Sequence, residues 1–336
     1  MRDNPDALEP DVLKRIYGDW LPVLIAAVFA ASCPAHAEYP DKPLRLIVPF
    51  PPGGGTDILV RAIGPKLTET WGQPVVVDNR GGANGMIGAA FAAKAPPDGQ
   101  TILAVPAGYA VNPSIYANLP YNPEKDLAPV TQLATSPMIL VVHPSLPVKS
   151  VRELIALARI RPGQINYATS GNGSPPHLAA EYFKTMAGVK LVHIPYKGPS
   201  AAMIDLMSGQ ISLYFMNMQT ALPHVKSGRL RALAVTSPTR FPAMAELPTV
   251  AEAGVPGYEM TNWYALLVPG GTPKDIIGKI NAEVVRILNS PAIRERLASE
   301  GAIVVGSTPE QFAAFLKQEM AKFAKIVKAS GMTATD

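Results

Sequence analysis

Short apolar runs alternate with amphipathic stretches of helical length from residue 43 onward. Runs of four to eight aliphatic and β-branched residues predict buried strands, and apolar residues three or four apart predict helices with one buried face. The predicted strands are 44–48, 74–78, 101–105, 139–143, 165–168, 191–194, 211–215, 231–236 and 263–268. The predicted helices are 57–70, 86–94, 150–161, 176–187, 199–208, 218–227 and 309–329. This alternation predicts an α/β fold in which helices cover parallel sheets.

Two similar stretches indicate where the chain crosses between two lobes. Residues 138–155 and 262–280 both contain an apolar strand, a proline-bearing turn and a helix start, with Ser150 and Thr272 as predicted N-caps. If each stretch begins a new lobe, residues 38–137 and 262–336 form lobe one and residues 138–261 form lobe two. Two crossing strands make a hinge, and the cleft between lobes is a common place for a small-molecule site. One continuous doubly wound sheet is the alternative.

The first 37 residues have the pattern of an export signal. Lys14 and Arg15 precede the apolar run 21–31, and Ala35-His36-Ala37 forms a small-x-small cleavage site. The run is shorter than the roughly 20 residues that a membrane span needs. We expect a periplasmic chain that begins at Glu38 and lacks the single cysteine, Cys33. A membrane anchor and a lipid anchor on Cys33 are the alternatives.

The composition excludes several classes of function. Without residues 1–37 the chain has 27 basic and 21 acidic residues, a net charge of about +6, which helps to attract anions. No long basic run, zinc spacing or helix-turn-helix motif is present, so we expect no nucleic-acid binding. The four histidines after residue 37 lack metal-ligand spacing, and the P-loop motif is missing, so we expect no metal and no cofactor.

Three glycine-rich segments each follow a predicted strand and precede a predicted helix. They are PFPPGGGTD (49–57), NRGGANGMIGAA (79–90) and TSGNGSPPHLAAEYF (169–183). Glycines let successive amide N–H groups point into one concavity, and a helix N-terminus adds partial positive charge. We predict that the first and third segments are facing cradles for an anion; simple turns are the alternative. Gly54 is expected to take a positive φ, so that valine there would harm binding more than folding.

Two residues of these segments allow a catalytic interpretation. Asp57 is expected to be a first-turn carboxylate that the helix dipole favours, rather than a catalytic acid. Ser174 and His177 permit a serine hydrolase, but the nucleophile elbow G-x-S-x-G is missing. We therefore predict that the protein is not an enzyme.

Several segments together resemble one known family, the Bug proteins. They are YPDKPLRLIVPFPPGGGTD, VVVDNRGGANGMIGA, YATSGNGSPPHLAAEYF, IPYKGPSAAMIDLMSGQ, RALAVTSPTRFPAMAELPTVAEAGVPGYE and LLVPGGTP, and the similarity covers residues 38–331. Bug proteins are the extracytoplasmic solute receptors of tripartite tricarboxylate transporters. The resemblance implies a type II periplasmic binding protein fold, with two doubly wound lobes joined by two crossing strands. It also implies a monomer that captures a small carboxylate and delivers it to membrane permease subunits; a sensor that signals to a kinase is the alternative.

The resemblance also assigns the ligand-binding residues. One wall comprises Phe50, Pro51, Pro52, Gly53, Gly54, Gly55, Thr56 and Asp57. The other wall comprises Ser170, Gly171, Asn172, Gly173, Ser174 and His177, and Ala107, Tyr196, Lys197 and Asn217 complete the set. Ser212 and Met216 stand where family members commonly have aspartates. The loss of a carboxylate at Met216 predicts a ligand without an ammonium group.

Overall fold

The computed structural model describes residues 39–333, of which residues 42–333 belong to one compact unit. Residues 39–41 belong to a separate N-terminal unit. The predicted signal peptide, 1–37, lies outside the described residues. Within 39–333, no helix is both long and apolar enough to cross a membrane.

The secondary structure follows the predicted alternation closely. The strands are β1 (Leu44–Val48), β2 (Val75–Asn79), β3 (Thr101–Pro106), β4 (Leu127–Val142), β5 (Asn166–Thr169), β6 (Val192–Pro195), β7 (Leu213–Asn217), β8 (Arg231–Val235), β9 (Thr261–Pro269) and β10 (Ile303–Val304). The helices are α3 (Gly55–Trp71), α4 (Met86–Ala93), α5 (Asn112–Ile115), α6 (Val151–Ile160), α7 (Pro175–Ala187), α8 (Pro199–Met207), α9 (Met218–Lys226), α10 (Lys274–Leu288), α11 (Pro291–Ser299) and α12 (Pro309–Ser330). Three short 3₁₀ segments are η2 (Ala83–Gly85), η3 (Ala107–Val111) and η4 (Pro242–Met244).

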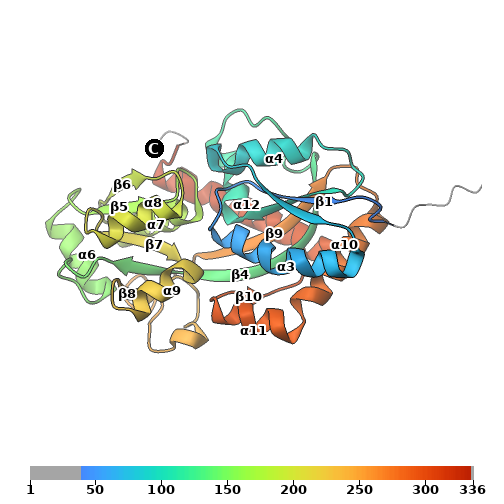
Figure 1. Ribbon diagram of the computed structural model, residues 1–336. Helices are drawn as coiled ribbons and strands as arrows, with labels where there is room; N and C mark the ends of the chain where they lie inside the picture. Colours follow the sequence, from blue (N-terminus) through green and yellow to red (C-terminus); the bar gives the residue numbers. More distant parts are fainter. Residues whose placement is uncertain (1–38, 334–336) are drawn as a thin grey trace, which may run out of the picture. The chain divides into compact units, whose positions relative to one another are not determined.

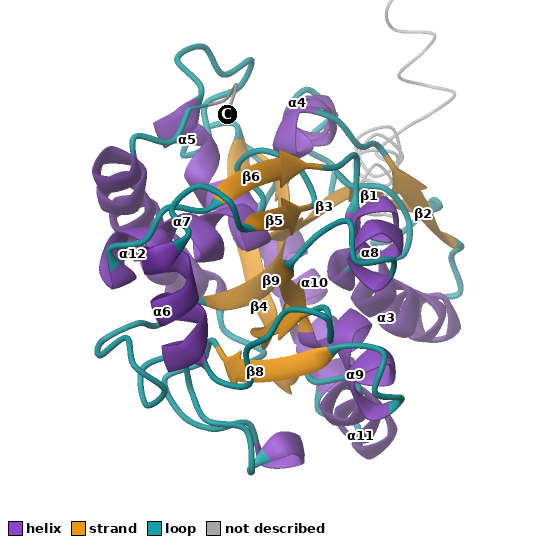
Figure 2. Ribbon diagram, turned by 90° about the vertical axis from the view of Figure 1, so that its left-hand side faces the viewer, coloured by secondary structure: helices purple, strands orange, loops and turns teal. Residues whose placement is uncertain are grey.

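Eight of the described strands form one hydrogen-bonded path in the order β2-β1-β3-β9-β4-β7-β5-β6, and β8 and β10 pair with β4 outside this path. β4 joins its two halves, because it pairs with β9 along 127–137 and with β7 and β8 along 138–142 (Figure 1). β1, β2 and β3 are parallel, as are β5, β6 and β7, whereas β9 and β4 are antiparallel to their neighbours. The sheet is therefore mixed, not parallel throughout, and helices lie on both of its sides (Figure 2).

The core does not divide at the predicted lobe boundary. One buried cluster contains Phe183 and Phe215, from the predicted lobe two, together with Trp263, Phe312 and Phe323, from the predicted lobe one. Helix α12 makes this link, since it packs against both β4 and α7. The division into lobes at 137 and 262 therefore stays a prediction, which the change of β4 partners near residue 137 supports.

The predicted N-caps have different outcomes. Ser150 caps α6, because its hydroxyl accepts a hydrogen bond from the Glu153 amide. The prediction for Thr272 is wrong: its hydroxyl donates to the Pro269 carbonyl, 2.7 Å away, and Pro273 occupies the N-cap position of α10. Thr272 thus closes the turn after β9 instead of starting the helix.

Candidate ligand-binding site

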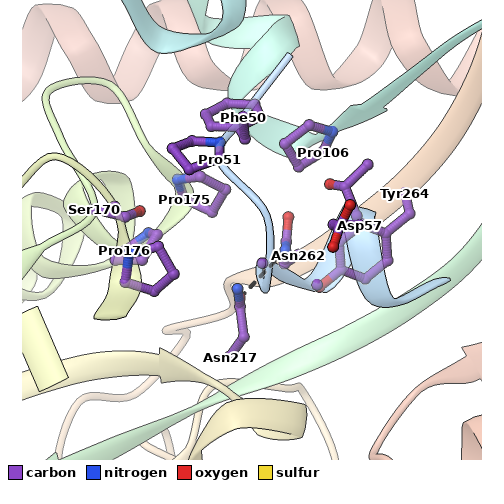
Figure 3. A pocket seen from close by; sticks show the side chains of 15 residues that line it. Phe50, Pro51, Asp57, Pro106, Ser170, Pro175, Pro176, Asn217, Asn262 and Tyr264 are labelled. Carbon is purple, nitrogen blue, oxygen red and sulfur yellow. Dashed lines mark hydrogen bonds between the residues drawn. The ribbon is translucent and has the colours of Figure 1, made fainter. Parts of the chain in front are cut away.

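A hollow lies where the carboxyl ends of β1, β3, β5 and β7 meet the start of β9. Figure 3 shows its lining side chains, which come from both halves of the sheet. The first hollow, as we name it, is lined by Phe50, Pro51, Gly54, Gly55, Thr56, Asp57, Pro106, Ser170, Pro175, Pro176, Gly198, Pro199, Asn217, Asn262 and Tyr264. Ligands of open α/β sheets bind at such strand ends.

Asp57 holds the loop before α3 in shape. Its carboxylate accepts hydrogen bonds from the Gly53 amide, from Arg61 Nε and from Asn79 Nδ2, all at 3.0 Å. Burial alone raises the pKa of Asp57, but the hydrogen bonds from Arg61, Gly53 and Asn79 outweigh it and hold the pKa below its ordinary value. Asp57 is therefore ionised at neutral pH, and its charge is already neutralised by Arg61.

Four helices begin at the first hollow: α3, α7, α8 and α9. Within the described chain, none of them has a side-chain hydrogen bond at its N-cap. The first-turn amides of a helix lack intrahelical partners and carry partial positive charge. None of the described lining residues is a lysine or an arginine. The partial positive charge that the helix termini bring to this hollow therefore belongs to backbone dipoles.

Asn217, Asn262 and Tyr264 supply side-chain polar groups at the base of the hollow (Figure 3). Asn262 is buried, and its Oδ1 accepts from the amides of Ala107 and Trp263. Its Nδ2 donates to Asn217 Oδ1 at 3.3 Å, which connects β9 with the end of β7. Asn217 Oδ1 is occupied in this way, so its Nδ2 group is the part available to a ligand.

The Tyr264 hydroxyl is buried and faces the first hollow. It lies near the amides of Asn262 and Gln219 but makes no well-formed hydrogen bond to a described protein atom. Burial raises the pKa of Tyr264 far above its ordinary value, so the hydroxyl stays a donor. The same group packs against Gly55, where a Cβ atom would overlap it.

The loop 170–174 differs from the expected backbone cradle, because three of its amides make hydrogen bonds within the loop or to neighbouring side chains. The Gly171 amide donates to Thr169 Oγ1, the Gly173 amide to His177 Nδ1, and the Ser174 amide to the Gly171 carbonyl. Pro175 and Pro176, which follow, have no N–H to offer. This wall therefore presents side chains, a proline surface and the dipole of α7.

The buried side chain of His177 stabilises the loop 170–174 through a hydrogen bond from Gly173. It is 1% exposed, stacks on His193 with ring centroids 4.0 Å apart, and accepts from Gly173 through Nδ1. Burial, with the nearby His193 and Lys184, lowers the pKa of His177 to about 3. His177 is thus neutral at physiological pH.

A second hollow adjoins the first, and the two share Phe50, Pro51, Ser170 and Gly198. It is also lined by Asn84, Asn172, Tyr196 and Lys197. The Tyr196 hydroxyl donates to Asp205 Oδ2 at 2.6 Å, and partial burial together with this acceptor raises the pKa of Tyr196 to about 12. Among the described residues, no three His, Cys, Asp or Glu side chains are grouped closely enough to hold a metal ion.

Comparison with known proteins identifies the family. A family model described as "Tripartite tricarboxylate transporter family receptor" matches residues 59–332. The chain belongs to this receptor family. Protein BugT of Bordetella pertussis is 38% identical over 311 residues, which are 92% of this chain and 95% of BugT. The predicted resemblance to Bug proteins is confirmed.

Two solved structures of R. palustris proteins confirm the predicted fold class of this receptor. Rpa4515 with adipate is 39% identical, with a TM-score of 0.85, over 88% of this chain and 99% of that one. MatC with bound malate is 30% identical, with a TM-score of 0.81, over 86% of this chain and 100% of that one. The chain is thus a mixed α/β protein of the periplasmic solute-binding type.

The receptor brings most of the predicted ligand-binding residues to the two hollows. Phe50, Pro51, Gly54, Gly55, Thr56, Asp57, Ser170 and Asn217 line the first. Gly171, Asn172, Tyr196 and Lys197 line the second. Pro52, Gly53, Ala107, Gly173, Ser174 and His177 line neither hollow. Ala107, Gly173 and His177 instead make hydrogen bonds that fix the surrounding loops.

The backbone of Gly54 and the location of Met216 both differ from what the sequence predicted. Gly54 has a φ of −80°, which any residue can adopt, and the left-handed residue of the loop is Gly53, with a φ of 85°. Met216 is buried in a core cluster with Ile139 and Tyr214 and lines neither hollow. An apolar residue at 216 therefore cannot set the polarity of the ligand wall directly.

Asn262 and Tyr264 are the polar residues of the first hollow that the sequence did not predict; the other unpredicted lining residues are Pro106, Pro175, Pro176, Gly198 and Pro199. Both lie on β9, which the apolar pattern identified only as a crossing strand. Their spacing of two residues places them on one face of the strand, opposite Trp263. A polar residue directly before a predicted buried strand, two residues from a tyrosine, was the signal available.

Proposed function

We propose that the protein is a periplasmic receptor that binds a small carboxylate in the first hollow and delivers it to a membrane permease. The observation that carries the proposal is the convergence of four uncapped helix N-termini on a hollow with no cationic side chain among its described lining residues. Such termini stabilise anions through the helix dipole and through N–H groups, of which α7 offers fewer because it begins with Pro175 and Pro176. Asn217 and Tyr264 add uncharged donors.

The same lining argues for a ligand without an ammonium group. Among the described lining residues, Asp57 is the only acidic one, and Arg61, Asn79 and Gly53 occupy its oxygens. An ammonium group in the hollow would meet partial positive charge and no free carboxylate. We therefore expect aliphatic or aromatic acids to bind more tightly than amino acids.

The relatives support both parts of the proposal. Rpa4515 and MatC, whose structures contain adipate and malate, share the fold and about a third of the sequence. The family's description as a transporter receptor supports delivery to permease subunits, and we expect the receptor itself to be a monomer. A solved structure described as a periplasmic transporter supports export of this chain, for which we expect a signal peptide at 1–37 and cleavage after Ala37.

The geometry gives no support to a hydrolase that uses Ser174 and His177. A general base must accept the proton of its serine, but His177 Nδ1 already accepts from the Gly173 amide. With a pKa of about 3, this imidazole is also a weak base at neutral pH. We therefore expect no turnover of chromogenic esters.

Native mass spectrometry of the protein purified from the periplasm tests this function. We expect an adduct whose mass, after denaturation and release, corresponds to a small organic acid. Adding millimolar adipate or malate to ligand-free protein should restore an adduct of that kind. An amino acid as the retained ligand would contradict the ligand class, and a protein that retains no small molecule and takes up no acid would contradict the receptor function.

A further inference from the structure

We propose that Asn84 is a latch that holds the two sides of the cleft together and thereby sets how fast the ligand leaves. The inference deepens the proposed function and rests on it for the ligand. Asn84 lies in η2, on the predicted lobe one, and it contacts Gly173, in the predicted lobe two. Neither residue lines the first hollow, and Asn84 lies at the wall of the second.

The Asn84 amide group connects three separate segments. Its Nδ2 donates to the Gly173 carbonyl at 3.0 Å, to Asn112 Oδ1 at 2.8 Å and to the Gly108 carbonyl at 3.2 Å. An amide nitrogen has two hydrogens, so three acceptors share them. Asn112 is buried and returns a hydrogen bond to the Asn84 carbonyl, which fixes the latch on the lobe-one side.

Glycines permit the close approach of these segments. A Cβ atom at Gly108 would lie 3.3 Å from both Asn84 Oδ1 and the Gly173 carbonyl oxygen. A Cβ atom at Gly173 would lie 2.8 Å from Asn84 Nδ2. The loop after β3 and the loop after β5 therefore meet at Asn84 with no room for side chains between them.

The backbone around Asn84 is strained in a way that depends on these contacts. Ala83 and Asn84 have φ values of 45° and 47°, and their neighbours Gly82 and Gly85 have values of 131° and 82°. A positive φ is unfavourable for residues that have a side chain. Such a conformation persists where contacts with the surrounding structure hold it in place. Opening the cleft removes the Gly173 contact, so the segment 82–85 is held less firmly in the open state.

A contact present only in the closed state has a specific kinetic effect. The ligand enters the open cleft, so loss of the latch leaves the association rate nearly unchanged. The ligand leaves after the cleft reopens, so loss of the latch speeds dissociation. Loss of a residue that only stabilised the fold would not speed dissociation while leaving association unchanged.

Two glycine variants form a matched pair for the test. Asn84→Gly removes the amide and relieves the strain, whereas Ala83→Gly relieves the same strain one residue earlier and leaves the amide in place. Any effect of Asn84→Gly beyond that of Ala83→Gly belongs to the latch. Asn84→Asp keeps the shape but points a carboxylate at the Gly173 and Gly108 carbonyls.

Hydrogen exchange of the ligand-free protein tests the contact through the closed conformations that the protein populates without ligand. We expect peptides that cover 107–112 and 170–174 to exchange faster in Asn84→Gly than in Ala83→Gly, with Asn84→Asp fastest. Equal exchange in the two glycine variants would overturn the latch. This result stands whether or not the proposed function is correct.

Stopped-flow tryptophan fluorescence with adipate and malate as probes tests the kinetic role. Asn84→Gly should raise the dissociation rate about three- to tenfold over Ala83→Gly, the range expected for one net hydrogen bond, with association changed less than twofold. Unchanged dissociation, or an equal loss in the association rate, would overturn the inference. If wild-type protein binds neither acid, the proposed ligand class fails, and the exchange experiment still decides the contact.

Discussion

Uncharged donors, rather than lysines or arginines, supply the side-chain chemistry of the first hollow. Asn217 and Tyr264 face it, and Asn262 holds Asn217 in place across the two halves of the sheet. Preformed dipoles in a buried site bind an anion without the desolvation cost of a buried cation. The acidic residue of the lining, Asp57, organises the loop through Gly53 and Asn79 and leaves no charge to repel the ligand.

The Tyr264 hydroxyl is expected to act on the ligand and not on the fold. It is buried without a well-formed hydrogen bond to a described protein atom, so Tyr264→Phe should leave the melting temperature unchanged or raise it slightly. Loss of a donor to a carboxylate should weaken binding of adipate or malate by about 1.5–3 kcal/mol. Calorimetric titration and thermal denaturation measure the two effects.

Tyr258→Phe is the matched control. The Tyr258 hydroxyl is as buried as that of Tyr264, but it donates to the Ala179 carbonyl at 2.9 Å, and Tyr258 lines neither hollow. That variant should lose about 1 kcal/mol of stability and keep its affinity. The assignment of Tyr264 fails if the two variants behave alike.

At the scale of elements, the sequence predicted strands and helices well where local pattern decides them. It missed the first half of β4, 127–137, because Pro129, Thr131 and Gln132 interrupt the apolar run. These polar groups are satisfied from far along the chain: Thr131 Oγ1 donates to the Ser307 carbonyl, and Ser307 Oγ accepts from the Gln132 amide. Register shifts at the same place add bulges that no periodicity reveals.

The candidate site, too, could be predicted only where its residues are consecutive in the sequence. The glycine-rich loop 49–57 was predicted as a binding segment, because the residues that form it follow one another directly. The role of Asn262 depends on the Ala107 amide and on Asn217, which the fold brings together from β3 and β7. Such contacts depend on tertiary structure, and one sequence does not contain them.

The first turn of α7 gives a prediction for pH dependence. The folded-state pKa of His177 is about 3, against 6.5 for an unperturbed histidine, so the unfolded chain takes up this proton first. The contribution of neutral His177 to stability is therefore complete above pH 6.5 and is lost as the pH falls from 6.5 toward 3. In His177→Asn, whose Oδ1 can still accept from Gly173, the stability lost between pH 7 and pH 4.5 should be smaller by about 2 kcal/mol.

Urea denaturation at several pH values measures this difference. Parallel pH profiles for wild type and His177→Asn would show that His177 is protonated in the folded state or that its site is open to water. The comparison needs no ligand, because His177 lines neither hollow.

At the scale of the whole compact unit, the crossing strand β9 separates the ligand site from the rear of the sheet. Asn262 and Tyr264 face the first hollow, whereas Trp263 packs against Phe312 and Phe315 and donates to Glu319 Oε2 at 2.9 Å. One strand therefore connects the ligand site with a buried tryptophan. Trp263 emission is expected to respond to ligand binding, also in a Trp71→Phe variant.

The first hollow binds the carboxylate of its ligand through backbone dipoles and offers no free carboxylate to an ammonium group; this is the central claim. Isothermal titration of adipate and malate against glutamate and aspartate, at the same pH and salt concentration, tests it most directly. We predict saturable one-to-one binding for at least one of the acids that lack an ammonium group, and at least tenfold weaker binding for both amino acids. Tight binding of glutamate or aspartate, or no heat with any acid of the four, would contradict it.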